Sequence, residues 1–218
     1  MSRCLIVFAK EPQNGNVKTR LKSHLSDAQR INLYKAFLKD TFALVKKIKC
    51  EGRILAYESA KKYPFYLKSI GKGFAFHKQK GKGLGERMHT AFRYAARQEY
   101  SKIIIIGSDS PTLPPAFIRQ AFKELNKNDA VLGPSLDGGF YLIGLKKPCY
   151  SVFKGIKWST RRVLKQALEN LRNLHKTVAL LPQWFDVDDP SGLGRLKQYL
   201  AVNKGRRIAP WTIKSLKI

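Results

Sequence analysis

Apolar residues along this chain follow two spacings, one typical of buried strands and one typical of amphipathic helices. The clearest strand is 103–106, four consecutive isoleucines, whose β-branched side chains suit a strand buried on both faces. The clearest helix begins at a capping box, Ser26 with Gln29, and carries apolar residues at helical spacing to about Lys49. Further strands are expected at 3–9, 53–58, 73–77, 129–133, 140–145 and 177–181, and further helices at 61–69, 84–95, 114–126, 159–174 and 189–200. Ser159 is expected to cap the helix over 159–174.

Strands and helices alternate nearly throughout, which predicts a Rossmann-like, doubly wound α/β fold with a mainly parallel sheet. The 218 residues show no break in composition, so we expect a single domain over 1–202 and a basic C-terminal tail over 203–218. The apolar runs are too short to span a membrane, and the first one suits a core strand better than a signal peptide. Three scattered cysteines indicate reduced thiols in a cytoplasmic protein.

Charge is the unusual bulk property: 42 Lys and Arg face 15 Asp and Glu, which gives a net charge of +27. Such an excess attracts nucleic acid or phosphate-rich substrates. The basic residues are spread over the whole chain and no recognition motif accompanies them, so nucleic-acid binding ranks last among the functions considered. Because acids are scarce, their positions in short turns are informative.

One such acid, Asp109, follows the isoleucine strand in the segment 107–111, Gly-Ser-Asp-Ser-Pro. Ligands of open α/β sheets bind at the carboxyl ends of strands, where a carboxylate can hold a hard divalent cation and its phosphates. The alternative is that Asp109 only caps the helix that begins near Pro114. From this segment alone the two interpretations are equally supported.

The first loop offers candidate phosphate-binding groups after the first strand, the position where α/β proteins bind nucleotides. Cationic donors come from Lys10, Lys18 and Arg20, with Thr19 between them, and Gly15 lets the backbone approach a phosphate. The loop matches neither a Walker A motif nor Gly-x-Gly-x-x-Gly. In so basic a chain, a solvated loop is the favoured interpretation of these residues taken by themselves.

Two glycine-rich stretches permit a functional and a structural interpretation. The stretch 81–87 ends in Gly85 and Arg87 and opens a helix, where backbone N–H groups suit an anion, although an ordinary turn fits too. Asp137, in Asp-Gly-Gly, is first of all a turn signal.

The acidic segment 186–189 favours a metal site more strongly. Three carboxylates within four residues repel one another, and a bound cation removes that cost. In an extended segment Asp186 and Asp188 point to the same side, which leaves Asp189 to cap the next helix. A solvated acidic turn is the alternative.

Taken in order, these motifs resemble a known family. They are 8–21 (Phe-Ala-Lys-x-Pro-x-x-Gly-x-Val-Lys-Thr-Arg-Leu), Gln79 with 83–88, 107–111, 133–144, Trp158-Ser159-Thr160 and 186–188. The set is similar to the DUF2064 proteins, which are described as nucleotide-diphospho-sugar transferases or glycosyltransferases of GT-A-like fold. The resemblance implies a nucleotide near Lys10, Lys18, Thr19 and Arg20. It also places Asp109 at the metal-binding acid of a GT-A Asp-x-Asp motif whose first acid is Gly107 here. In related phospholactate and phosphoenolpyruvate guanylyltransferases a later Asp-x-Asp joins the mid-chain acid, and Asp186 with Asp188 match it.

Three functions follow, in order. The first is a metal-dependent glycosyltransferase: Mg²⁺ or Mn²⁺ on Asp109, Asp186 and Asp188 holds the diphosphate of a nucleotide-sugar donor, and Asp137 contacts the sugar or acts as base toward an unidentified acceptor. The second is a nucleotidyltransferase that joins a nucleoside triphosphate to a phosphorylated small molecule and releases pyrophosphate. Those enzymes usually carry an Arg-x-Gly-x-x-Lys loop, which is absent here. The third is a nucleic-acid-binding protein. The oligomeric state is left open.

Overall fold

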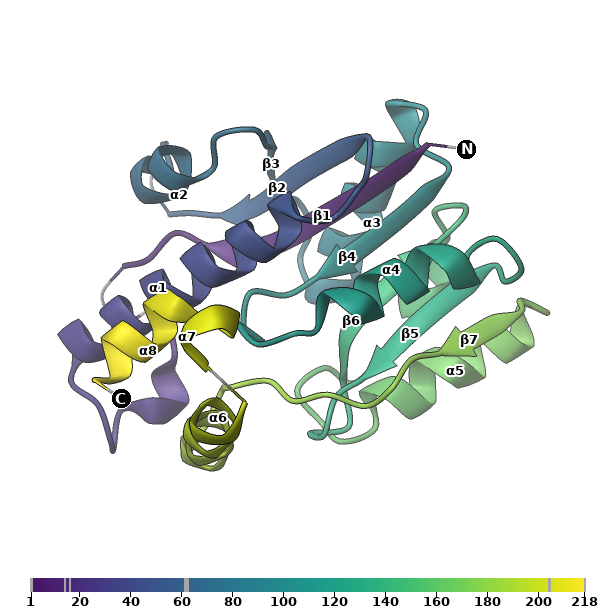
Figure 1. Cartoon of the computed structure of the whole chain (residues 1–218). Helices are drawn as coiled ribbons and strands as arrows, with labels where there is room; N and C mark the ends of the chain where they lie inside the picture. Colours follow the sequence, from purple (N-terminus) through teal and green to yellow (C-terminus); the bar gives the residue numbers. More distant parts are fainter. Residues whose placement is uncertain (1, 14, 16, 61–62, 204, 218) are drawn as a thin grey trace.

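A single twisted sheet of seven strands forms the centre of the molecule (Figure 1). The computed structural model describes residues 2–13, 15, 17–60, 63–203 and 205–217. The strands are β1 (Arg3–Lys10), β2 (Gly52–Glu58), β3 (Ala75–Lys78), β4 (Lys102–Ile106), β5 (Ala130–Pro134), β6 (Phe140–Leu145) and β7 (Val178–Leu180), in the spatial order β3-β2-β1-β4-β6-β5-β7. Only β6 runs antiparallel to its neighbours, β4 and β5. The prediction of a mainly parallel, doubly wound sheet is confirmed.

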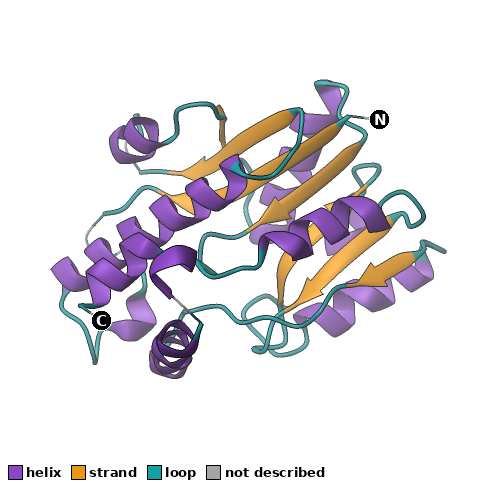
Figure 2. Ribbon diagram, viewed as in Figure 1, coloured by secondary structure: helices purple, strands orange, loops and turns teal. Residues whose placement is uncertain are grey.

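Helices cover both faces of the sheet (Figure 2). The longer ones are α1 (Asp27–Lys46), α3 (Leu84–Arg97), α4 (Pro115–Glu124), α5 (Val163–Asn173) and α6 (Pro190–Val202). The short ones are α2 (Phe65–Ile70), α7 (Gly205–Ile208), α8 (Pro210–Leu216) and the 3-10 turns η1 (Thr19–Leu21) and η2 (Tyr150–Phe153). Apolar side chains of α1, α2 and α4 pack on one face, and those of α3, α5 and η2 pack on the other.

The isoleucine strand shows why both faces must be covered. Ile104 and Ile106 belong to the core under α1 and α4, whereas Ile103 and Ile105 belong to the core under α3 and α5. All four side chains are at most 4% exposed. Alternation of side chains along a strand forces this division, and it fixes the end of β4 from two sides.

Helix starts follow the capping residues in two of three predicted cases. Ser26 and Gln29 form the expected capping box on α1, and Asp189 accepts the Gly192 N–H at the start of α6. The prediction that Ser159 caps a helix is wrong, because α5 begins only at Val163. Ser159 has a left-handed backbone (φ 62°), which a helix cap of the usual extended geometry does not have.

The C-terminal segment folds back onto α1. The carboxylate of Asp40, in the middle of α1, accepts the backbone N–H groups of Trp211 and Thr212 and the Thr212 hydroxyl, the last at 2.6 Å. Ala209 and Ile213 join a third apolar cluster, which lies between α1, α6 and α8 and includes Leu21 of η1 and Val187, within the acidic segment. The residues predicted as a basic tail therefore help to hold two site-bearing segments. No described helix combines the length and the apolar composition that crossing a membrane requires.

Candidate functional site

A cavity of about 1000 Å³ opens at the carboxyl ends of β1, β2 and β4. In the sheet, β2 lies next to β1 on one flank and β4 lies next to β1 on the other flank. The cavity therefore sits where the strand order reverses. Ligands of open α/β folds bind at this switch point. Six of the fifteen acids in the chain line the cavity: Glu58, Asp109, Asp137, Asp186, Asp188 and Asp189. So high a concentration of scarce residues marks it as the candidate active site.

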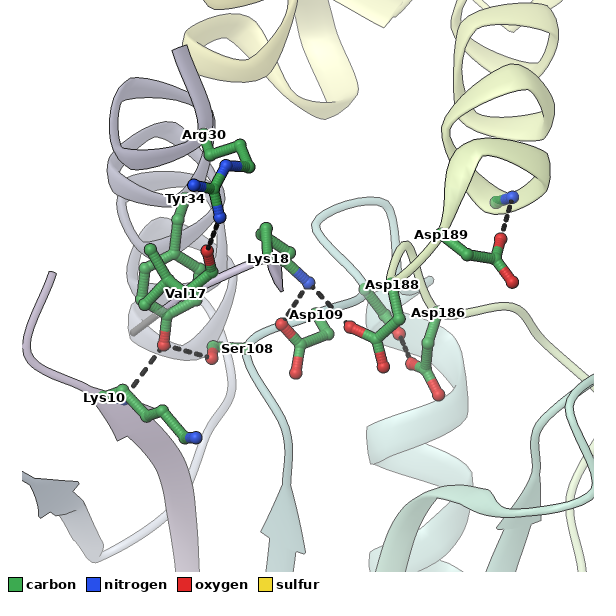
Figure 3. Close-up of polar contacts among 12 residues, drawn as sticks. Lys10, Val17, Lys18, Arg30, Tyr34, Ser108, Asp109, Asp186, Asp188 and Asp189 are labelled. Carbon is green, nitrogen blue, oxygen red and sulfur yellow. Dashed lines mark hydrogen bonds and ion pairs between the residues drawn. The ribbon is translucent and has the colours of Figure 1, made fainter. Parts of the chain in front are cut away.

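The Lys18 ammonium lies at the centre of the cavity wall. Its side chain is 2% exposed and forms ion pairs with Asp109 and with Asp188, the latter at 3.0 Å from Nζ to Oδ1 (Figure 3). Burial alone lowers the pKa of Lys18, but the two carboxylates outweigh burial and raise it. The backbone of Lys18 is left-handed (φ 50°), an uncommon conformation for a residue with a side chain. The first loop is thus held in a strained geometry that delivers one buried positive charge.

Asp109 and Asp188 are far apart in the sequence, and a backbone hydrogen bond holds their two segments together. The Val187 N–H donates to the Asp109 carbonyl at 2.9 Å, which places Asp188 beside the end of β4. Asp186 points elsewhere, since the hydroxyls of Ser110 and Ser135 donate to its two carboxylate oxygens. Burial, together with the negative charges of Asp109 and Asp188, raises the pKa of Asp186 to about 6, whereas the two serine hydrogen bonds act to lower it.

Asp109 and Asp188 suit a divalent metal. Lys18 contacts only Oδ1 of each acid, and the side chains are 39% and 47% exposed, so one oxygen of each remains accessible from the cavity. Magnesium typically binds one or two carboxylates and takes its other ligands from phosphates and water. Among the described residues no three His, Cys, Asp or Glu side chains lie together as a ready ligand set. Asp186 as a third ligand therefore stays a prediction, and each of its two oxygens already accepts one serine hydroxyl.

The alternative role of Asp109, as a helix cap, does not describe this geometry. The helix after it, α4, begins at Pro115, and its N-cap is Pro114, with no side-chain hydrogen bond to the helix. Asp109 instead faces Lys18.

One end of the cavity lies over β2 and the start of α3. Glu58, at the carboxyl end of β2, pairs with Arg87 at 2.9 Å and with Lys10 at 3.8 Å. Gln79, just after β3, donates its side-chain amide to the Ala56 carbonyl and lines the cavity. This end offers both donors and acceptors.

The other end lies over β5 and β6. The Asp137 carboxylate accepts the Gly139 N–H at 2.9 Å and forms a tight turn. A side chain on Gly138 would lie 2.3 Å from the Arg161 carbonyl oxygen, so this turn packs directly on the loop before α5. Arg161, in that loop, and Arg195, on α6, also line the cavity, and neither forms an ion pair with any described residue.

The cavity wall includes most of the residues predicted from the sequence. Those on it are Lys10, Lys18, Thr19, Arg20, Arg87, Asp109, Asp137, Asp186 and Asp188. Gly15 and Gly85 do not line it. A side chain on Gly85 would lie 2.8 Å from Phe153 Cβ, so close packing of α3 against η2 explains that glycine. Sequence reasoning missed Tyr34, Glu58, Ser108, Ser135, Arg161 and Arg195. Of these, Glu58 carries the same signal as Asp109, an acid at the end of a strand.

Comparison with known proteins adds a family and relatives. A family described as "Uncharacterized protein conserved in bacteria (DUF2064)" matches residues 41–160. A 2-phospho-L-lactate guanylyltransferase of Methanocorpusculum labreanum is 29% identical over 183 residues, which is 83% of this chain and 77% of that protein. One from Methanocaldococcus jannaschii is 27% identical over 192 residues, 88% of this chain and 81% of that protein.

Solved structures agree with the fold. A protein from Desulfovibrio desulfuricans G20, provisionally described as a nucleotide-diphospho-sugar transferase, is 32% identical, with a TM-score of 0.91 over 100% of this chain and 95% of that one. An inositol-1-phosphate CTP transferase from T. maritima is 16% identical, with a TM-score of 0.59 over 98% of this chain and 96% of that one, a likeness of fold alone.

These relatives correct the predicted function. The curated proteins that match most of this chain are guanylyltransferases, which are nucleotidyltransferases. The first-ranked prediction, a glycosyltransferase with a nucleotide-sugar donor, is therefore wrong, and the second-ranked one is favoured. The misleading signal was the absence of the Arg-x-Gly-x-x-Lys loop from the first loop of this chain.

Proposed function

This chain belongs to the DUF2064 family, and we propose that it is a nucleotidyltransferase. It joins a nucleoside triphosphate, with GTP as the first candidate, to a small phosphorylated acid and releases pyrophosphate. The observation that carries the proposal is the Lys18–Asp109–Asp188 cluster, which lies between two ends of one cavity. Two substrates can thus meet at a single charged centre. The guanylyltransferase names of the curated relatives support the choice of reaction and base.

The nucleotide is proposed to occupy the end over β1, β2 and α3. Lys10 and Arg87, both paired with Glu58, are the cations proposed for its phosphates, and the side chains of Glu58 and Gln79 line the same end of the cavity, where its base or ribose is proposed to lie. Lys18 and Arg20 lie on the wall nearest the acids and neutralise charge that moves onto the departing pyrophosphate. A divalent metal held by Asp109 and Asp188 would add positive charge at the phosphates.

The acceptor is proposed to lie over β5 and β6 and to be held by the guanidinium groups of Arg161 and Arg195, which form no ion pair with any described residue and suit an anion. One oxygen of its phosphate attacks the α-phosphorus of the nucleotide, and the bond from that phosphorus to the bridging oxygen of the β-phosphate breaks. A phosphate monoester is already largely ionised at neutral pH. The nucleophile therefore needs no general base, which agrees with a cavity wall on which no histidine lies among the described residues.

Pyrophosphate release tests the proposal directly. The native protein is mixed with Mg²⁺, each of GTP, CTP, ATP and UTP, and a panel of phosphorylated acids that includes 2-phospholactate and phosphoenolpyruvate. We expect release with at least one pair, and a loss of at least about 100-fold in Asp109→Asn, whose altered group is proposed to hold the metal ion at the reacting phosphates. Glu169→Gln, an exposed acid on α5, is the matched control. No release with any pair would refute the proposal.

A further inference from the structure

Tyr34 of α1 links the ends of the two central strands. Its ring is buried in the core under α1, and its hydroxyl accepts the Lys10 N–H at 2.9 Å, at the end of β1. The same hydroxyl lies 3.0 Å from the Ser108 hydroxyl, which follows β4 and directly precedes Asp109 (Figure 3). One phenol therefore connects the segment that carries Lys10 with the segment that carries the candidate metal ligand.

The direction of the Tyr34–Ser108 hydrogen bond follows from the available partners. A phenol keeps its hydrogen at neutral pH, and the Lys10 N–H can only donate. Among the described residues, Ser108 Oγ is the only acceptor bonded to the Tyr34 hydroxyl. Any other arrangement leaves a buried O–H without an acceptor, which costs about 1–3 kcal/mol. Tyr34 thus donates to Ser108.

The Ser108 hydrogen is then left for another partner. Ser108 is 2% exposed but lies on the cavity wall, and within the described chain its hydroxyl bonds only to Tyr34. Because Tyr34 donates to one lone pair of the Ser108 oxygen, the Ser108 hydrogen is free to be donated to a group in the cavity. Buried donors of this kind are normally satisfied by a ligand or water.

Other contacts from α1 fix the same region. The buried Arg30 guanidinium donates to the Val17 carbonyl at 3.3 Å, one residue before Lys18. The Lys18 ammonium lies 6.0 Å from the ring centre of Tyr34 and 5.2 Å from that of Phe37. One face of α1 therefore positions both ends of the first loop and the residue beside Asp109.

We propose that Ser108 binds substrate, and that Tyr34 is the positioning residue that directs the Ser108 hydroxyl hydrogen into the cavity. The partner is a phosphate oxygen of the nucleotide, because Lys10, Lys18 and Asp109 surround this point and a donor there complements a negative oxygen. This inference rests on the proposed binding of a nucleoside triphosphate at the same site.

Nucleotide affinity tests the inference without requiring turnover. Calorimetry with Mg²⁺ and the tightest binder among GTP, CTP, ATP and UTP gives the Kd of Ser108→Ala, Tyr34→Phe and the double variant. We expect each single variant to bind about 10- to 150-fold more weakly, as for one lost hydrogen bond to a charged oxygen. The double variant should match Ser108→Ala within about twofold, because Tyr34 acts through Ser108.

The control separates positioning from folding. Tyr66→Phe also removes one part-buried tyrosine hydroxyl, which donates to the Lys35 carbonyl away from the cavity, and its Kd should equal that of the native protein. A native Kd in Ser108→Ala, or effects that multiply in the double variant, would overturn the inference. Nucleotide binding with these effects but no pyrophosphate release would overturn the proposed function and support the inference.

Discussion

Replacing Lys18 by methionine should lower the unfolding free energy, because Asp109 and Asp188 then lose the positive charge that neutralises them. Removing one partner of a fully buried ion pair costs about 3–5 kcal/mol of unfolding free energy. Asp109 and Asp188 are 39% and 47% exposed, so water takes over part of the screening. We therefore expect a loss of about 1–3 kcal/mol. For a protein of this size each kcal/mol lowers the melting temperature by about 2–4 °C.

Divalent cations should reverse much of this loss. Urea unfolding of Lys18→Met is measured with EDTA and with Mn²⁺, because the freed carboxylates can bind the ion and a ligand of the native state stabilises it. The gain from Mn²⁺ should exceed that of the native protein, in which Lys18 competes for the same acids. Lys22→Met, an exposed lysine four residues along, is the control and should show neither effect. A Lys18→Met protein that is as stable as the native one, or indifferent to Mn²⁺, would refute the reasoning.

Three further predictions concern the walls of the site. Because the pKa of Asp186 is about 6, above the value of about 3.9 for an unfolded Asp, the unfolding free energy of the metal-free protein should fall as pH rises from about 4 to about 6. Asp186→Asn should flatten this part of the urea-unfolding profile, and an unchanged slope would contradict the assignment. Gly138→Ala should displace Arg161 and so raise the KM of the acceptor at least about fivefold, with little change in the Kd of the nucleotide. Equal effects on both constants would count against a separate acceptor end. Thr212→Val removes one hydrogen bond to the Asp40 carboxylate and should cost about 1.5–3 kcal/mol in urea unfolding, whereas a native midpoint would show that this contact does not hold α8.

The sequence was informative where one local rule determines the structure. Four isoleucines require a doubly covered strand, and an acid at its end falls at the binding edge of the sheet, so Asp109 could be found. The antiparallel direction of β6 could also be predicted from the sequence, because the connection between Gly133 and Phe140 is too short for the crossover that parallel strands need. Tyr34 was hidden, since helical spacing assigns it to the core and its ring does lie there. Only the fold shows that its hydroxyl reaches two strand ends.

The division of the cavity between two parts of the sheet has an evolutionary consequence. The charged centre rests on β1 and β4, whose side chains are fixed by cores on both faces, so substitutions there disturb the whole domain. The proposed acceptor end is lined by the β5–β6 turn, the loop before α5 and the first turns of α6, which tolerate exchange more readily. If the proposed function holds, new acceptors can be acquired by altering those segments while the proposed phosphate chemistry is kept. Relatives with different substrates should diverge first at positions equivalent to 136–139, 158–161 and 195.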